Sequence, residues 1–523
     1  MSLESPPSIN GLNPSVDKDN SKETNFFDTS HLKADIKGHS IRGGAVTIAA
    51  QGVKFVLQTG STAILARLLT PEDFGLIAMV SVFTEFVNLF KDLGLSMATI
   101  QKKDITHGQV SILFWINVAM SCFLMLIAAA ISPLVARFYG EPRLMLITIA
   151  IGSTFIFGGL IAQNTALMRR QMRFRALAII EIISLAAGVT AAVIAASFGL
   201  SYWSLVVMMA VKGLANVVFV WRVSKWRPDW PRRNSDVRSM LVFGGSLTAT
   251  NILGYFSKTS DNLIIGYALG PAILGIYTKA YGLLTLPMSQ LNWPLRSVMI
   301  PALSRLQDEP KQYRRFFLQA LSAIAVVAMP AAAFLFVAAD EIVNILLGNQ
   351  WGAVVTTFRC LAPAAFLCTV SFAPGWLFVS LGRAGTQFRL MMLSTPIMVI
   401  GFLIGVNWGI NGVAISFSIT WTTIFIVSII WACRKSPIEF YDFCKALIVP
   451  VFSSLLSAAG AGFSLIIVLE SNIIVRLAVT ILVFVFCYFI CVIATPAGRR
   501  IIRSMINALS AFQIKSRLKK DSK

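Results

Sequence analysis

The sequence predicts an all-α, polytopic membrane protein of about fourteen transmembrane helices. Of its 523 residues, 56% are hydrophobic and only 13% are charged, whereas a soluble domain carries about 25% charged residues. The apolar residues form continuous runs of about 20 residues or more, the length that a helix needs to cross a bilayer core of about 30 Å. Strands of a membrane barrel would instead alternate polar and apolar residues over about ten positions. Continuous runs therefore favour helices.

A window of about 20 residues gives the candidate spans in order. Their approximate bounds are 44–66, 74–98, 110–135, 143–166, 176–198, 202–222, 241–267, 273–298, 316–338, 357–382, 386–406, 410–432, 445–468 and 474–494. The second span is unusual because it carries Glu85, Lys91 and Asp92.

The basic residues predict the orientation of these spans. With the N-terminus inside, cytoplasmic segments hold 35 Lys and Arg residues and outer loops hold 4. Such a bias in short loops marks the cytoplasmic side, and an even number of spans puts both termini there. The net charge of +21 is thus explained by membrane orientation and anionic lipids, and nucleic acid is not an expected partner. Residues 1–40 lack the features of a signal peptide and are expected to form a disordered cytoplasmic tail, and residues 496–523 a basic one.

The chain also contains an internal repeat at an offset of 200 residues. ILARLLTPEDFG at 64–75 matches IIGYALGPAILG at 264–275, so that Pro71 and Gly75 fall on Pro271 and Gly275. Six predicted spans separate the copies, which therefore run in the same direction. Two tight outer turns would explain each motif alone, but not the similarity of the helices before them. We expect two pseudo-symmetric six-helix lobes, residues 41–225 and 238–435, and two additional helices at 440–495.

A few charges fall inside the predicted spans, where each costs about 2.5–3.5 kcal/mol unless it faces a cavity, a partner or an interface. Basic residues exceed acidic ones, a balance that suits an anionic substrate with phosphate oxygens. Other interpretations remain open: Lys91 can reach the interface, Arg359 can belong to the outer headgroup region, and Lys258 and Asp261 can neutralise each other. The predicted cavity cations are Lys54, Lys212, Lys258, Lys279 and Arg359, and the predicted charge partners or ion-coupling residues are Glu85 and Asp261.

No catalytic, metal or cofactor site is expected. The seven cysteines include no CxxC pair, and the three histidines lie outside the apolar runs. Cys487 and Cys491 share a helix face, where cysteine usually serves as a small packing residue.

Three segments resemble a known family, the polysaccharide transporters of the multidrug/oligosaccharidyl-lipid/polysaccharide exporter superfamily, which include Wzx-type flippases. The segments are ARLLTPEDFGLIAM at 66–79, DNLIIGYALGPAILGIYTKAY at 261–281 and PALSRLQDE at 301–309. Arg67 and Pro71 belong to the first motif, and Asp261 and Gly266 to the second.

The resemblance implies a V-shaped pair of lobes in the bacterial cytoplasmic membrane. It implies transfer of an undecaprenyl-pyrophosphate-linked oligosaccharide to the outer leaflet by alternating access, for surface polysaccharide synthesis. H⁺ or Na⁺ could couple through Glu85 or Asp261, and the polysaccharide polymerase machinery is a possible contact.

Two other functions remain as alternatives. A multidrug exporter of the same superfamily would have twelve spans and a cavity dominated by acids. A membrane polymerase or ligase would need acid–base or phosphate-binding groups on its outer face. The longest outer loop, residues 338–355, offers only Asp340 and Glu341, which argues against an enzyme. A scaffold would leave the buried charges without a purpose.

Overall fold

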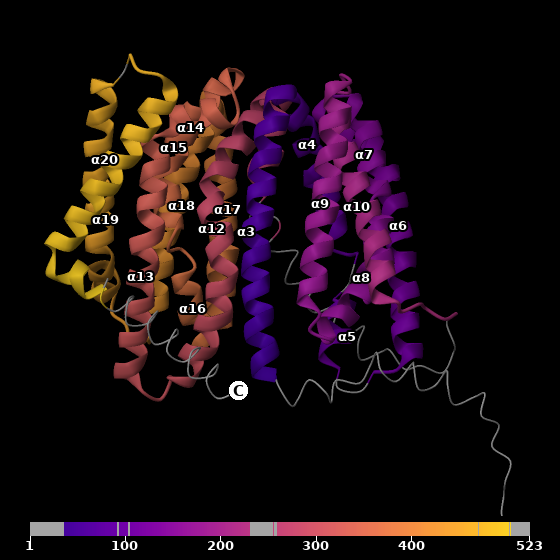
Figure 1. Ribbon diagram of the computed structural model, residues 1–523, viewed down its shortest axis with the longest axis horizontal. Helices are drawn as coiled ribbons and strands as arrows, with labels where there is room; N and C mark the ends of the chain where they lie inside the picture. The colour runs from indigo at the N-terminus through magenta and orange to yellow at the C-terminus, as the bar shows by residue number, and fades with distance from the viewer. Residues whose placement is uncertain are drawn as a thin grey trace, which may run out of the picture. The chain divides into compact units, whose positions relative to one another are not determined.

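A computed structural model describes residues 36–91, 94–102, 105–230, 255, 259–468, 470–501 and 503, with side chains from residue 49 onward except those of 286–297. Asp92 and Lys258 lie outside the described residues. Regular structure in the described ranges is helical throughout (Figure 1), which confirms the predicted fold class. The longer helices are α3 (Ile36–Leu68), α4 (Pro71–Asn88), α6 (His107–Tyr139), α7 (Arg143–Ser153), α8 (Phe155–Arg170), α9 (Phe174–Ser197), α10 (Trp203–Ser224), α12 (Pro271–Arg305), α13 (Pro310–Val337), α15 (Gly352–Cys368), α17 (Ala384–Gly405), α18 (Gly409–Cys433), α19 (Phe440–Ile467) and α20 (Ile473–Ala494). Shorter ones are α5 (Leu95–Gln101), α14 (Ala339–Leu346), η1 (Asn349–Trp351), α16 (Ala373–Ser380) and η2 (Val406–Trp408).

Within the described ranges, nine helical segments are long and apolar enough to cross a membrane. One of them, Ala384–Cys433, contains two predicted spans, residues 386–406 and 410–432. The total of fourteen spans stays a prediction.

The structure divides the second predicted span, residues 74–98. Helix α4 ends at Asn88, and α5 begins at Leu95 after Gly94, whose φ is 68°. Glycine adopts this left-handed conformation without steric penalty. The expected single helix is thus two shorter ones, because hydropathy does not reveal where a helix is interrupted.

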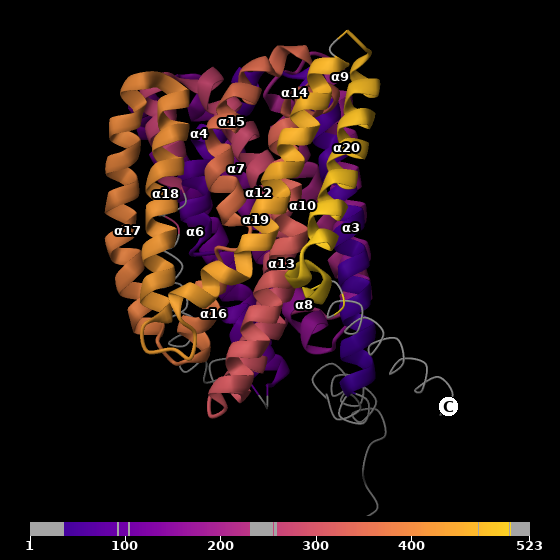
Figure 2. The ribbon, with the colours of Figure 1, turned by 90° about the vertical axis from the view of Figure 1, so that its left-hand side faces the viewer.

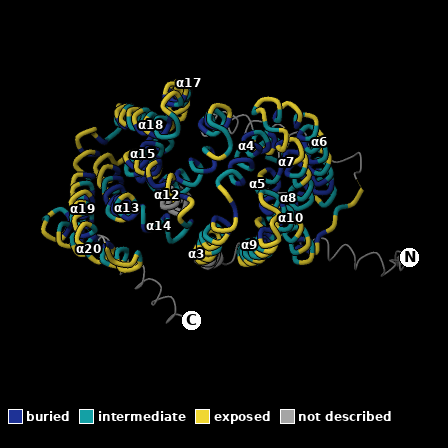
Figure 3. The backbone as a smooth tube through the Cα atoms, turned by 90° about the horizontal axis from the view of Figure 1, so that it is seen from above, coloured by how far each residue is buried: buried dark blue, intermediate teal, exposed yellow. Residues whose placement is uncertain are grey.

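Apolar side chains lie on the outer faces of the helices as well as where the helices pack against one another. Helices α17 and α18 lie side by side, as do α19 and α20 (Figure 2). Exposed residues follow much of these four helices in the view from above (Figure 3). They include Leu403 of α17, Phe463 and Ile467 of α19, and Leu482 and Phe486 of α20. Long helices with this much exposed apolar surface need lipid as their solvent. The protein is a multi-pass membrane protein.

The described helices belong to two compact units. Unit 1 contains residues 1–59, 83–137 and 141–254, and unit 2 contains 60–82, 138–140 and 255–523. In unit 1, α9 packs along α10, which also contacts α8. In unit 2, α13 packs on α19, and α15 contacts α12 and α18. The predicted lobe boundaries stay a prediction.

The two copies of the repeated motif contact each other inside unit 2. A Cβ atom built on Gly75 would lie 1.7 Å from the carbonyl oxygen of Pro271, and one built on Gly275 would lie 1.8 Å from the carbonyl oxygen of Pro71. Gly75 and Gly275, and likewise Pro71 and Pro271, differ by 200 in number, so the two contacts are reciprocal. Equivalent residues meet in this way around a two-fold axis, which agrees with the duplication that the sequence predicts.

Candidate functional site

Unit 1 contains an ion pair between two predicted transmembrane helices. Lys54 of α3 lies with its Nζ 2.6 Å from Oε2 of Glu181 on α9. The side chains are 21% and 46% exposed. Pairing reduces the penalty of holding each charge among apolar helices. Glu181 was not among the predicted site residues, although it is the one acid in the predicted span 176–198, a signal that could have identified it.

Lys212 is an exposed cation about halfway along α10 in the same unit. It has no hydrogen bond or ion pair with any described residue, in contrast to Lys54. The backbone around it packs tightly on α9, since a Cβ on Gly188 would lie 2.9 Å from Cβ of Lys212 and 2.8 Å from the carbonyl oxygen of Met208. This close contact fixes the position of the Lys212 stem, while its amine remains available to a ligand.

Lys54 and Lys212 both contact helix α9, at Glu181 and Gly188 respectively. Glu181 and Gly188 are seven residues apart on α9, which is about two turns and roughly 10 Å along one face of a helix. Glu181 contacts Lys54 at one level, and Gly188 contacts Lys212 at the other. One face of α9 therefore contacts Lys54 through Glu181 and, about two turns away, the stem of Lys212 through Gly188. Glu85 on α4 is also exposed, and it forms no ion pair with a described residue.

Asp261 of unit 2 lies in a closed polar contact. The side chain is buried. Its Oδ1 accepts a hydrogen bond from its neighbour Asn262 at 2.8 Å, and its Oδ2 accepts one from the Tyr277 hydroxyl of α12 at 3.1 Å. Because Lys258 lies outside the described residues, its predicted pairing with Asp261 stays a prediction.

Lys279 lies against aromatic rings. Its Nζ is 3.4 Å from the ring centroid of Phe74 and 5.9 Å from that of Trp351. These two rings meet edge to face at 5.6 Å. Cation–π attraction is strongest where the cation is desolvated, so the rings stabilise the ammonium without a carboxylate. Its predicted role in substrate binding stays a prediction.

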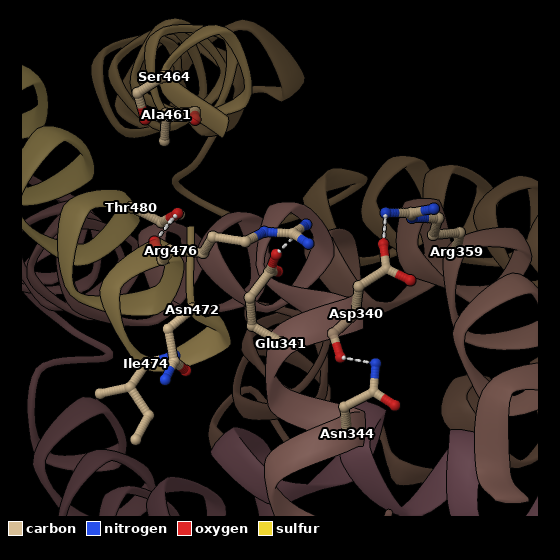
Figure 4. A network of polar contacts seen from close by, with 10 residues as sticks. All are labelled: Asp340, Glu341, Asn344, Arg359, Ala461, Ser464, Asn472, Ile474, Arg476 and Thr480. Atoms are coloured by element: carbon tan, nitrogen blue, oxygen red, sulfur yellow. Dashed lines mark hydrogen bonds and ion pairs between the residues drawn. The ribbon is translucent and has the colours of Figure 1, made fainter. Parts of the chain in front are cut away.

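Three arginines hold the short helix α14, and Figure 4 shows two of them. Nη2 of Arg359 on α15 lies 2.5 Å from Asp340, and Nη2 of Arg476 on α20 lies 2.6 Å from Glu341. From α3, Arg67 donates a hydrogen bond of 2.7 Å to the carbonyl oxygen of Ile345 (not drawn in Figure 4). Asp340 and Arg359 are half exposed, whereas Glu341 is only 1% exposed. The predicted cation Arg359 thus belongs to a network with α14.

The described residues contain no candidate metal site, because no three His, Cys, Asp or Glu side chains among them are grouped to hold an ion. Among the predicted site residues in those ranges, Lys212 and Glu85 are exposed and form no ion pair with a described residue.

We expect the Lys54–Glu181 pair to show coupling in a double-mutant cycle. Glu181→Gln leaves Lys54 unpaired, and Lys54→Met leaves Glu181 unpaired. The losses of unfolding free energy in the two single variants should therefore sum to more than the loss in the double variant. Residues in direct contact couple by about 0.5–3 kcal/mol. Thermal unfolding of the purified variants measures this coupling, with the exposed loop residue Glu470→Gln as control. Additive effects would show that the pair is not a stabilising contact.

Comparisons with known proteins agree with one another. A family model described as "Polysaccharide biosynthesis protein" matches residues 64–356, more than half of the chain. Lipopolysaccharide biosynthesis protein WzxC of Escherichia coli (strain K12) is 26% identical over 361 residues, which are 68% of this chain and 73% of WzxC. Teichuronic acid biosynthesis protein TuaB of Bacillus subtilis (strain 168) is 26% identical over 339 residues, 64% of this chain and 69% of TuaB.

Among solved structures, the lipid II flippase MurJ in an inward closed conformation superposes with a TM-score of 0.67 at 12% identity, covering 86% of this chain and 98% of MurJ. An inward-facing multidrug resistance MATE transporter has a TM-score of 0.58 at 14% identity, covering 72% and 93%. These likenesses show the fold that the chain shares with both proteins.

Proposed function

The chain belongs to the family of polysaccharide biosynthesis proteins, and from this premise we propose that it is a lipid-linked oligosaccharide flippase. Its substrate would be an oligosaccharide attached through pyrophosphate to a polyprenyl lipid, carried from the inner to the outer leaflet of the bacterial cytoplasmic membrane. The relatives support this proposal by their names, which include a succinoglycan biosynthesis transport protein of Rhizobium meliloti and a probable glycan biosynthesis flippase of Haloferax volcanii. The product is the substrate moved to the other leaflet, so no bond is made or broken.

The single observation that carries the proposal is the exposed Lys212, which forms no hydrogen bond or ion pair with a described residue. An exposed cation at mid-span has a large penalty unless an anion or water reaches it. A pyrophosphate group supplies several oxygens that accept charge-assisted hydrogen bonds. Lys54 would act with it when the substrate displaces or shares Glu181. We place the pyrophosphate at these lysines and the polyprenyl tail in lipid.

Orientation and coupling complete the proposal. The basic segments would hold both termini in the cytoplasm, so that the substrate enters from the inner leaflet. Glu85 is the candidate for coupling to H⁺ or Na⁺, because it is exposed and forms no ion pair with a described residue, whereas Asp261 is buried against Tyr277. Contacts with the polymerase machinery would follow release on the outer side.

The test is translocation by Lys212 variants of the full chain. We expect Lys212→Ala to slow appearance of lipid-linked oligosaccharide on the outer leaflet by about 10- to 100-fold, the value of one hydrogen bond to a charged group. Lys212→Arg should retain most of the rate, since it keeps the charge. The assay follows inner-leaflet accumulation in cells that depend on this chain for surface polysaccharide.

Lys311→Ala serves as the matched control, because Lys311 is an exposed lysine at the first turn of α13. It should leave the rate unchanged. If Lys212→Ala folds normally and translocates at the full rate, the cationic site is not at Lys212. If deletion of the whole chain causes no lipid-linked oligosaccharide to accumulate on the inner leaflet, the proposed flippase function is excluded.

A further inference from the structure

A pocket of about 320 Å³ lies within unit 2, away from the charges described above. Its size falls at the lower end of the range for small-ligand sites, about 300–1,000 Å³. The described residues that line it include none that is ionisable, and they combine aromatic rings with hydroxyl and amide groups. They come from α12, α16, α17, α18 and the turn before α16, and the polar and aromatic ones are Ser371, Phe372, Trp376, Gln387, Ser394 and Ser428.

Several polar groups around this pocket have no partner among the described residues. The Trp376 side chain is only 1% exposed, yet its indole Nε1–H donates no hydrogen bond. A buried donor without an acceptor is unfavourable, which makes such groups rare. Ser428 and the amide of Gln387 also form no side-chain hydrogen bond with described residues. Gln387 of α17 and Ser428 of α18 therefore bring unused hydrogen-bonding capacity to the pocket, whereas the Trp376 N–H is too buried for a ligand to reach.

Gly375 leaves space for one of these groups. A Cβ at this position would lie 3.8 Å from Nε2 of Gln387, so the amide lies over the bare backbone of α16. Ser371 and Ser394 donate hydrogen bonds to carbonyl oxygens of Cys368 and Met391 in their own turns. Their hydroxyl oxygens can still accept. The pocket thus offers both donors and acceptors.

The depth of the pocket suits the head of a membrane lipid. Gln387 and Ser394 lie three and ten residues from the start of α17 at Ala384, or about 5 and 15 Å at 1.5 Å per residue. Arg383, Arg434 and Lys435 flank this end of α17 and α18, which the charge bias assigns to the cytoplasmic side. A polar group attached to an inner-leaflet lipid could reach this depth.

We propose that the pocket binds one neutral sugar residue of the transported substrate. This proposal rests on the flippase function proposed above and adds a second subsite to it. A sugar ring carries hydroxyls that both donate and accept, together with an apolar face that packs on aromatic side chains. A phosphate would need cations, which the described lining does not supply. This pocket therefore suits a sugar and not the pyrophosphate.

The subsite has a consequence for selectivity. A site that hydrogen-bonds a particular hydroxyl discriminates strongly against an analogue that lacks it, because its own polar groups are then left unpaired. The Gln387 amide is thereby the specificity-determining group. Substitutions at this position should change which sugars bind, without affecting the recognition of pyrophosphate.

The experiment measures binding of methyl glycosides to the full chain in lipid nanodiscs free of sugar detergents. Saturation-transfer difference NMR with methyl glucoside, galactoside, mannoside and N-acetylglucosaminide detects weak binding. We expect at least one glycoside to bind. Gln387→Leu should weaken its binding about 2- to 12-fold, the value of one neutral hydrogen bond. Gln319→Leu, an exposed glutamine on α13, is the matched control and should bind normally.

Inorganic pyrophosphate is the second probe and separates the two proposals. Its binding should be weakened by Lys212→Ala and unaffected by Gln387→Leu. If no glycoside binds, or if Gln387→Leu and Gln319→Leu bind equally well, the sugar subsite is excluded while the flippase proposal stands on translocation. If glycosides bind as expected but deletion of the chain causes no lipid-linked oligosaccharide to accumulate, the subsite stands and the flippase proposal fails.

Discussion

Substituting alanine for Gly75 is expected to destabilise the protein by about 3 kcal/mol, the upper end of the usual range for an overpacked site, or more. The new Cβ would lie 1.7 Å from the carbonyl oxygen of Pro271, and a backbone atom cannot move aside as a flexible side chain can. The helices that begin at Pro71 and Pro271 would have to separate. Thermal unfolding of the purified protein measures the loss, and Gly275→Ala should have a similar effect because its contact is the reciprocal one.

The control and the double variant sharpen this result. Gly282 lies on the same helix as Gly275, and a Cβ there would meet no atom within 4 Å. Gly282→Ala should therefore be neutral or stabilise by about 1 kcal/mol through helix propensity. Gly75→Ala/Gly275→Ala should cost less than the sum of its two parts, since the helices need to separate only once. Additive effects would show that the two glycines do not share one contact.

This contact is the part of the architecture that the sequence predicts best. The alignment of Pro71 and Gly75 with Pro271 and Gly275 anticipates that the two motifs are equivalent. Hydropathy anticipates the long apolar helices, since lipid leaves the backbone few other ways to satisfy its hydrogen bonds. The interruption between α4 and α5 escaped prediction because hydropathy does not reveal where a helix ends within an apolar run.

The pairing of charges could be predicted less well. Lys54 was expected to be a cavity cation, but its partner Glu181 depends on how α3 and α9 are rotated, which apolar runs do not specify. Lys279 was grouped with other lysines because two aromatic residues distant in sequence, Phe74 and Trp351, give no signal of a cation–π contact. Lys212 was identified by its position in mid-span, which is a property of the sequence alone.

Removing one partner of the Glu341–Arg476 pair is expected to be the most destabilising change to a charge in the described part of unit 2. A sequence window of 20 residues overlooks this pair because α14 is only 8 residues long. Glu341 is 1% exposed, and its carboxylate accepts no hydrogen bond from a described residue apart from this ion pair. Arg476→Ala leaves that carboxylate buried and uncompensated, which should cost about 3–5 kcal/mol.

The reverse change should be milder. Arg476 is 28% exposed, so after Glu341→Ala its guanidinium can turn toward solvent and headgroups. We therefore expect Arg476→Ala to lower the unfolding temperature more than Glu341→Ala does. Glu341→Leu/Arg476→Leu should recover much of the loss, because apolar residues often replace a buried ion pair without a penalty.

The neighbouring pair is the control that isolates burial. Asp340 adjoins Glu341 on α14 and bonds Arg359 at a similar distance, but both side chains are nearly half exposed. An exposed pair contributes only about 0–1 kcal/mol, so Asp340→Ala should scarcely change the unfolding temperature. Equal losses from Asp340→Ala and Arg476→Ala would mean that α14 depends on its charges regardless of burial. A much larger loss of unfolding temperature in Arg476→Ala would mean that the buried Glu341 carboxylate needs its ion pair with α20, whereas the exposed Asp340 does not need its own.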